Sequence, residues 1–241
     1  LPAHVPSHVA ADTGPLALVL TAQMTGSGPE PPQAPPLDVA DLALSVNRAR
    51  SQYQACRYSD LVSQLPRLLA YLHVACLTLD GDAQLRAYAL SADAYHVTAG
   101  FLLKVGDQGL AHLATDRSMN AALSSGNPLA VGASARIVIH TLMKSGHLTA
   151  AISTARSHSL RLDREIPAQT PESLSVYGSV LLRGAIAAAH DVASADEAGH
   201  GYLDYSVHYA NFVLLTCIVG SGSSLVALGW PQLFSSPAYV G

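Results

Sequence analysis

The chain has 241 residues, of which 49% are hydrophobic and 12% are charged, and its formal net charge is −4 with the histidines counted as neutral. Global disorder requires low hydrophobicity and high net charge, so this composition excludes it. A nucleic-acid-binding domain usually has a basic surface or a high isoelectric point, and neither is indicated here. The three cysteines are widely spaced and form no CxxC pair, which is typical of a reducing, cytoplasmic protein.

Residues 1–36 are predicted to be a flexible segment rich in Pro and Gly. Pro2, Pro6 and Pro15 interrupt any regular element, and the run GSGPEPP at 26–32 is a linker that favours the polyproline II conformation. Within this segment, the apolar stretch 16–24 is expected to form one or two helical turns. A domain boundary is therefore placed before residue 37.

From Asp38 onward the pattern is that of a helical domain, predicted to span residues 37–198. Asp38 is a suitable N-cap, and the residues after it recur at spacings of three and four along one helical face: Val39, Leu42, Val46, Ala49 and Tyr53. A second helix is predicted from about residue 59, with Pro66 marking a kink or a late start. Further helices are predicted at about 83–105, 108–124, 129–144, 148–162 and 171–190, separated by a turn at 79–82, by Gly-containing turns and by a polar linker at 163–171.

Two of the predicted helical hairpins share a repeat. Gly106 and Gly146 are 40 residues apart, and Ala111 and Ala151 keep the same step. A period in this range is typical of helical solenoids, because one hairpin cannot bury its apolar faces alone and must stack on a neighbour. Small residues such as these alanines allow two helices to approach closely. The sequence therefore predicts an all-α solenoid of antiparallel helical hairpins.

The segments 102–111 and 142–151 both match the form L-x-K-x-G-x-x-x-x-A, and they resemble tetratricopeptide repeats, although the step is longer than the usual period of about 34 residues. More specifically, residues from about 37 to 190 resemble the C-terminal sensor region of actinobacterial helix-turn-helix transcriptional regulators of the phage-repressor (Xre-like) type. The runs that carry this resemblance are YQACRY at 53–58, LPRLLA at 65–70, residues 94–106, SGNPL at 125–129 and LSVYGSVLL at 174–182.

The resemblance implies a regulatory module that binds a peptide, a protein or a small molecule. In the family a DNA-binding helix-turn-helix lies upstream, and residues 1–36 do not supply one. We therefore expect a fragment that contacts DNA only through a missing upstream domain and that binds no specific DNA sequence by itself. A homodimer is compatible with this interpretation. The alternative is a stand-alone protein–protein interaction scaffold, or an inactive truncated remnant.

The helical pattern fades after Glu197, and residues 199–241 are predicted to be a divergent tail rich in Gly and Ser. The stretch 212–230 is uncharged over 19 residues, which is long enough for a membrane span. Its Ser, Gly and Thr content instead favours a buried or poorly packed tail, so no membrane contact is expected.

In solenoids of this kind the first helix of each hairpin lines the concave surface, where a ligand binds. Polar residues on the predicted first helices are therefore the candidate groove residues: Asn47, Arg50, Asp93, His96, Arg136 and His140. A solvated helix face is the competing explanation for each of them.

No pattern in the sequence predicts catalysis, a cofactor or a metal. Eleven histidines are present, but none belongs to the ligand set of a closed zinc site. Residues 132–136 lack the second Gly of a nucleophile elbow, and the run GSGSS at 220–224 lacks the GK[ST] ending of a phosphate loop. We therefore expect a non-enzymatic protein.

Overall fold

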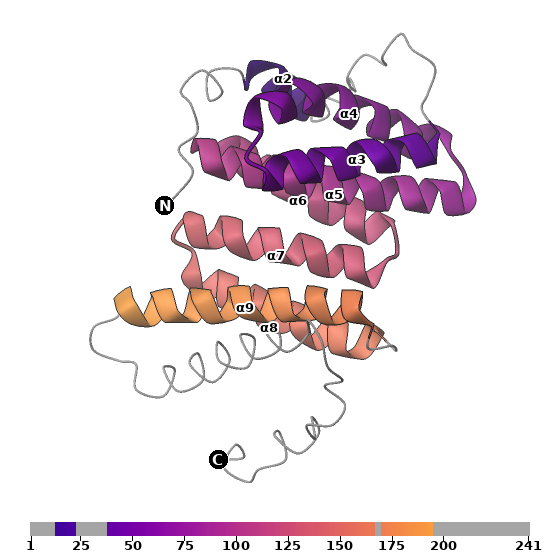
Figure 1. The fold of residues 1–241 in the computed structure, drawn as a ribbon. Coiled ribbons are helices and arrows are strands. Elements are labelled where there is room, and N and C mark those ends of the chain that lie inside the picture. Colours follow the sequence, from indigo (N-terminus) through magenta and orange to yellow (C-terminus); the bar gives the residue numbers. More distant parts are fainter. Residues whose placement is uncertain (1–12, 23–37, 167–169, 195–241) are drawn as a thin grey trace.

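The computed structural model describes residues 13–22, 38–166 and 170–194, and in this part of the chain every regular element is a helix (Figure 1). The prediction of an all-α fold is confirmed. The helices are α2 (Gly14–Ala22), α3 (Val39–Gln54), α4 (Tyr58–Thr78), α5 (Gly81–Val105), α6 (Gln108–Ser124), α7 (Pro128–Lys144), α8 (Leu148–Glu165) and α9 (Pro171–Ser194).

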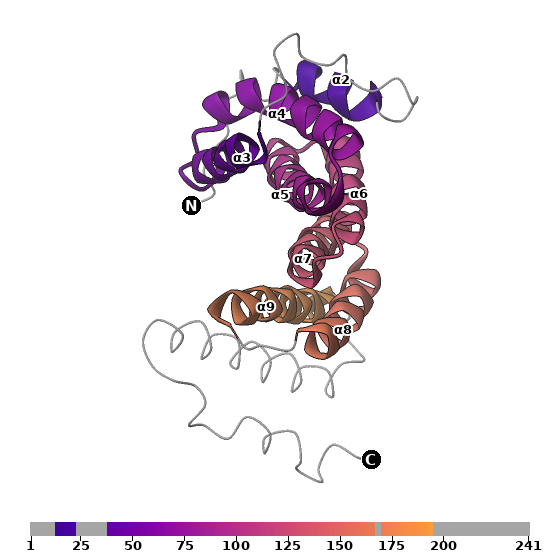
Figure 2. The same cartoon turned by 90° about the vertical axis from the view of Figure 1, so that its right-hand side faces the viewer.

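The helices form two layers that curve together (Figure 2). Helices α3, α5, α7 and α9 lie side by side on the hollow side of the curve, each in contact with the next, and are called the inner helices below. Helices α4, α6 and α8, the outer helices, cover them from behind. The hairpins are α3–α4, α5–α6 and α7–α8, and α9 follows as a further inner helix.

The same turn joins the two helices of each hairpin. In every case a backbone N–H bonds a carbonyl five residues earlier: Arg57 to Gln52 at 2.8 Å, Asp107 to Leu102 at 3.0 Å and His147 to Leu142 at 2.9 Å. The preceding residue is left-handed, with φ of 57° at Cys56, 86° at Gly106 and 78° at Gly146. This is a common way to end a helix. The repeat seen between Gly106 and Gly146 thus extends to the first hairpin, where cysteine replaces glycine.

Small and aliphatic residues fill the space between the layers. Ala111 and Ala151, predicted to lie where helices approach closely, are both fully buried. The predicted apolar stripe of α4 is buried as well: Leu61, Leu65, Leu68, Leu69 and Leu72. Pro66 lies inside α4 and does not delay its start. One core cluster joins α2 to α6 and includes Ile137 of α7, and a second joins α7, α8 and α9.

The core also extends into the N-terminal segment that was predicted to be flexible. Helix α2 buries Leu16 and Leu20 completely and packs against α4 and α6. Arg117 of α6 donates a hydrogen bond from Nη2 to the carbonyl oxygen of Leu20 at 2.8 Å. A cation at the last carbonyls of a helix also complements the helix dipole. Residues 13–22 therefore belong to the helical domain, so the predicted boundary before residue 37 is wrong for this stretch.

Several predicted boundaries shift by a few residues. Helix α5 begins at Gly81, inside the predicted turn 79–82, and α8 continues to Glu165, which shortens the predicted linker 163–171. Helix α9 continues to Ser194, beyond the predicted end at residue 190. The predicted tail 199–241, with its uncharged stretch 212–230, lies outside the described residues.

Helix α4 is the one described helix that is long and apolar enough to cross a membrane. However, 56% of its most apolar window is buried inside the structure. Leu61, Leu65 and Leu69 are fully buried in the core formed with neighbouring helices. We therefore interpret α4 as a core helix of the domain.

Candidate functional site

The inner helices bring together five of the six candidate groove residues. Arg50 of α3 contacts Asp93 of α5, and His96 of α5 contacts Arg136 of α7. His140 lies one turn after Arg136 on α7, within the electrostatic influence of Arg136. Asn47, the sixth residue, is exposed on α3. Ligand binding by these residues stays a prediction.

Arg50 and Asp93 form an ion pair, with 2.6 Å between Nη2 and Oδ2. Their side chains are 46% and 34% exposed, so the pair contributes little to the free energy of folding. Burial raises the pKa of Asp93, and the positive charge and hydrogen bond of Arg50 oppose that rise. The pair links α3 to α5 and orients the Arg50 guanidinium toward Asp93.

His96 and Arg136 form an unusual pair, because neither partner is acidic. Arg136 Nη2 lies 2.6 Å from His96 Nε2. Since arginine has no acceptor, Nε2 must accept this bond, and the proton of the neutral ring is then on Nδ1. The ring also hydrogen-bonds to the backbone of Ala133. Burial, followed by the charge of Arg136, lowers the pKa of His96 to about 3. His96 is therefore neutral at pH 7 and orients Arg136 without neutralising it.

Sequence reasoning missed two residues of this surface, Arg183 of α9 and Tyr53 of α3. Arg183 is half-buried, and burial lowers its pKa. Its charge acts on Arg136, whose pKa is lowered first by burial and next by Arg183. The signal for Arg183 was present in the sequence, since it is the one Asp, Glu, Lys or Arg between residues 173 and 190.

Tyr53 was counted among the packing residues of the first helix, yet it also reaches the inner surface. Burial raises its pKa, and the charges of Arg136 and Arg183 oppose the rise. Its ring crosses toward α5 at Gly100, where an added Cβ would lie 3.0 Å from the Tyr53 hydroxyl oxygen. Because Gly100 has no side chain, the Tyr53 ring can lie against α5 at this position.

The inner surface carries an excess of positive charge. His140 shows this most clearly: after burial, Arg183, Lys144, Arg136 and Lys104 lower its pKa, in that order, to about 4. Together with Arg50 these four residues are called the inner basic cluster below. Two carboxylates, Asp93 and Glu172, act electrostatically among these groups. Among the described residues, these five cations and two carboxylates influence one another's charge around Arg136 and His140, in a chain whose net charge is −4.

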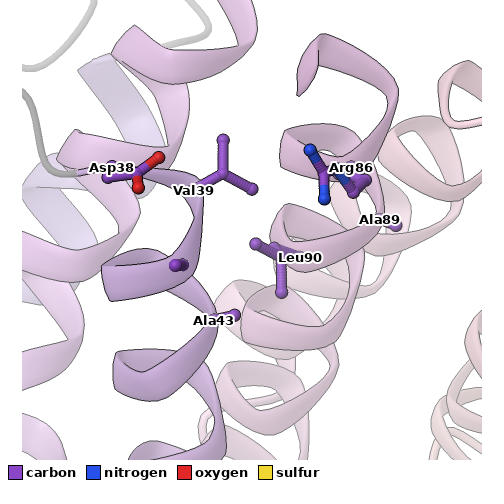
Figure 3. Close-up of a pocket in the computed structure, with 7 residues that line it drawn as sticks. Asp38, Val39, Ala43, Arg86, Ala89 and Leu90 are labelled. Atoms are coloured by element: carbon purple, nitrogen blue, oxygen red, sulfur yellow. The ribbon is translucent and has the colours of Figure 1, made fainter. Parts of the chain in front are cut away.

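A separate recess of about 360 Å³ lies between the start of α3 and α5 (Figure 3). Its walls are mostly apolar, with Asp38 and Arg86 at opposite sides: Asp38, Val39, Ala40, Ala43, Arg86, Ala89 and Leu90. None of the candidate groove residues lines it. Among the residues that the structure describes, no group of three or more His, Cys, Asp or Glu side chains is placed to hold a metal ion.

Comparison of the chain with protein-family models, with curated protein sequences and with solved structures gave no match. The resemblance to regulator sensor regions therefore depends on the sequence runs alone.

Proposed function

We propose that this chain is a binding module of tetratricopeptide-like helical hairpins that takes a peptide or small-molecule ligand on its inner surface. We further propose that it is the regulatory region of a transcriptional regulator, which contacts DNA through a separate helix-turn-helix domain. The observation that carries the binding proposal is the inner basic cluster, whose half-buried members Arg136 and Arg183 form no ion pair within the described residues.

The arrangement of this cluster supports a binding role. Arg136 and Arg183 are half-buried and form no ion pair within the described residues. Partly buried charges without opposite charges destabilise a fold, so these two are seldom explained by stability alone. Here two of the cations are also held in fixed orientations, Arg50 by Asp93 and Arg136 by His96. Groups that are already oriented lose less side-chain entropy when a ligand binds.

The same geometry favours binding over catalysis. A general base works best when its pKa lies near the working pH. The pKa of His96 is lowered to about 3 and that of His140 to about 4. In addition, the Nε2 lone pair of His96 already accepts a bond from Arg136. These two histidines are therefore poor proton acceptors at pH 7.

Selection from a displayed random peptide library against the full chain tests the binding role. Hydrogen–deuterium exchange should then show that a selected peptide protects the inner helices α3, α5, α7 and α9. Protection confined to the outer helices α4, α6 and α8 would contradict the proposal.

The regulatory role needs a separate test, since a stand-alone scaffold would use the same surface. The upstream coding sequence should read in frame into a helix-turn-helix domain. An upstream domain of another kind would favour the scaffold.

A further inference from the structure

We infer that Arg136 and Arg183 form the acid-binding point of the inner surface, and that the ligand is an extended acidic peptide whose carboxylates these guanidinium groups bind. This inference rests on the proposed binding function and names the chemistry of the ligand.

Within the described residues neither guanidinium group forms an ion pair, although the charge of Asp93 acts on Arg136. Arginine carries five N–H donors. The acceptor that the structure gives Arg136 is the neutral His96 ring, at 2.6 Å, and within the described residues Arg183 makes no hydrogen bond or ion pair. Both side chains are half-buried. Donors in this position are most stable when a ligand supplies the acceptors, and carboxylates match the planar guanidinium fork.

Helix packing holds the two arginines in place. His96 orients Arg136 on α7. Arg183 is followed by Gly184, which lies so close to α8 that an added Cβ would be 2.7 Å from Ala155 Cβ. Helix α9 also meets α7 directly, because an added Cβ at Gly132 would lie 2.6 Å from Val176 Cγ1. The packing of α9 on α7 and α8 therefore sets where the Arg183 backbone lies relative to the Arg136 backbone.

The distribution of charge indicates a ligand with several acidic groups. The inner basic cluster comes from all four inner helices: Arg50 from α3, Lys104 from α5, Arg136 and Lys144 from α7, and Arg183 from α9. Cations spread along a surface in this way fit a chain of carboxylates better than one isolated anion. The net charge of −4 opposes long-range attraction of any polyanion, so binding must depend on the local cluster. Nucleic-acid-binding domains usually have a high isoelectric point or a more extended basic surface, which favours a short acidic peptide here.

Calorimetric titration of the full chain tests this inference with two synthetic peptides, (Gly-Glu)4 and its uncharged counterpart (Gly-Gln)4. We expect the Glu peptide to bind, and the Gln peptide to bind at least ~10-fold more weakly, which corresponds to about 1.4 kcal/mol. Arg136→Gln and Arg183→Gln should each weaken binding of the Glu peptide by roughly 10-fold. Arg183→Lys, which keeps the charge, should weaken it less than Arg183→Gln.

Arg156→Gln is the matched control, because Arg156 is exposed on the outer helix α8. It should leave the affinity unchanged. Thermal melts by circular dichroism establish that each variant is folded before titration. The inference is overturned if the Glu peptide fails to bind at about 1 mM, if the two peptides bind equally, or if neither arginine variant differs from Arg156→Gln.

Two further outcomes separate this inference from the proposed function. If peptides selected from the library protect the inner helices but carry no acidic residues, the binding function stands and the acidic ligand is wrong. If the oligonucleotide dT12 binds more tightly than (Gly-Glu)4 and depends on Arg136 and Arg183, the basic cluster serves a nucleic acid and the inference is also wrong.

Discussion

Two glycines of helix α9, six residues apart, should respond in opposite ways to the same substitution. At Gly184 an added Cβ would lie 2.7 Å from Ala155 Cβ, whereas at Gly178 nothing lies within 4 Å. Carbon atoms in contact prefer a separation of about 3.5–4.0 Å. Because Ala155 Cβ is fixed to its backbone, Gly184→Ala must push α9 away from α8 by on the order of 1 Å.

The two effects can be given magnitudes. Replacing Gly by Ala inside a helix stabilises the fold by about 0.5–1 kcal/mol when the site is open. Gly178→Ala should therefore raise the free energy of unfolding by that amount. Overpacking costs about 1–3 kcal/mol, so Gly184→Ala should lower the free energy of unfolding by a net ~0.5–2 kcal/mol.

Urea unfolding followed by circular dichroism measures both values. In thermal melts the expected shift is about 2–4 °C per kcal/mol for a domain of this size. Gly178→Ala serves as the control for the general effect of alanine in α9. If both substitutions stabilise the protein to the same extent, α8 and α9 do not meet at Gly184, and the packing argument for Arg183 fails with it.

Three further predictions follow from other parts of the structure. Ala111→Leu and Ala151→Leu should each lower the free energy of unfolding by ~1–3 kcal/mol, because both sites are fully buried. Since the two sites lie in different hairpins, the effects of the two substitutions should nearly add in thermal melts of the double variant. Cys56→Gly should stabilise the protein by about 0.5–1 kcal/mol in urea unfolding, since φ is 57° there, whereas Gly106→Ala, at φ 86°, should destabilise it. His96 is neutral in the folded protein because its pKa is lowered from 6.5 to about 3, so the unfolded chain binds its proton first as the pH falls. The contribution of His96 to the free energy of unfolding should be retained above pH 6.5. Below pH 6.5 it should fall by up to about 1.4 kcal/mol per pH unit. Unfolding titrations at several pH values should show a smaller slope for His96→Gln.

The helix order could be predicted from the sequence because its signals are local. Apolar spacings of three and four identify helical faces, and glycines such as Gly106 and Gly146 mark the turns between them. The same register indicated which polar residues lie on inner helices. Arg50, Asp93, His96 and Arg136 were selected for that reason, and the structure brings them into pairs.

Other features depend on contacts between distant parts of the chain, which no local pattern reveals. The docking of α2 uses a hydrogen bond from Arg117 to Leu20, 97 residues away. Ser118 and Ser134 share a buried hydrogen bond at 2.8 Å between α6 and α7, although serine spacing alone would place neither in the core. The left-handed turn at Cys56 was hidden because cysteine does not favour that conformation.

The charged inner surface and the small residues of the inner helices depend on each other. The charge of Arg183 reaches Arg136 and lowers its pKa, and α9 lies against α7 and α8 at positions with little or no side chain, Gly132 and Gly184. Like charges repel, and within the described part of the chain Arg183 forms no ion pair. Helix packing therefore holds two like charges within reach of each other although they repel, and an acidic ligand would reduce that repulsion.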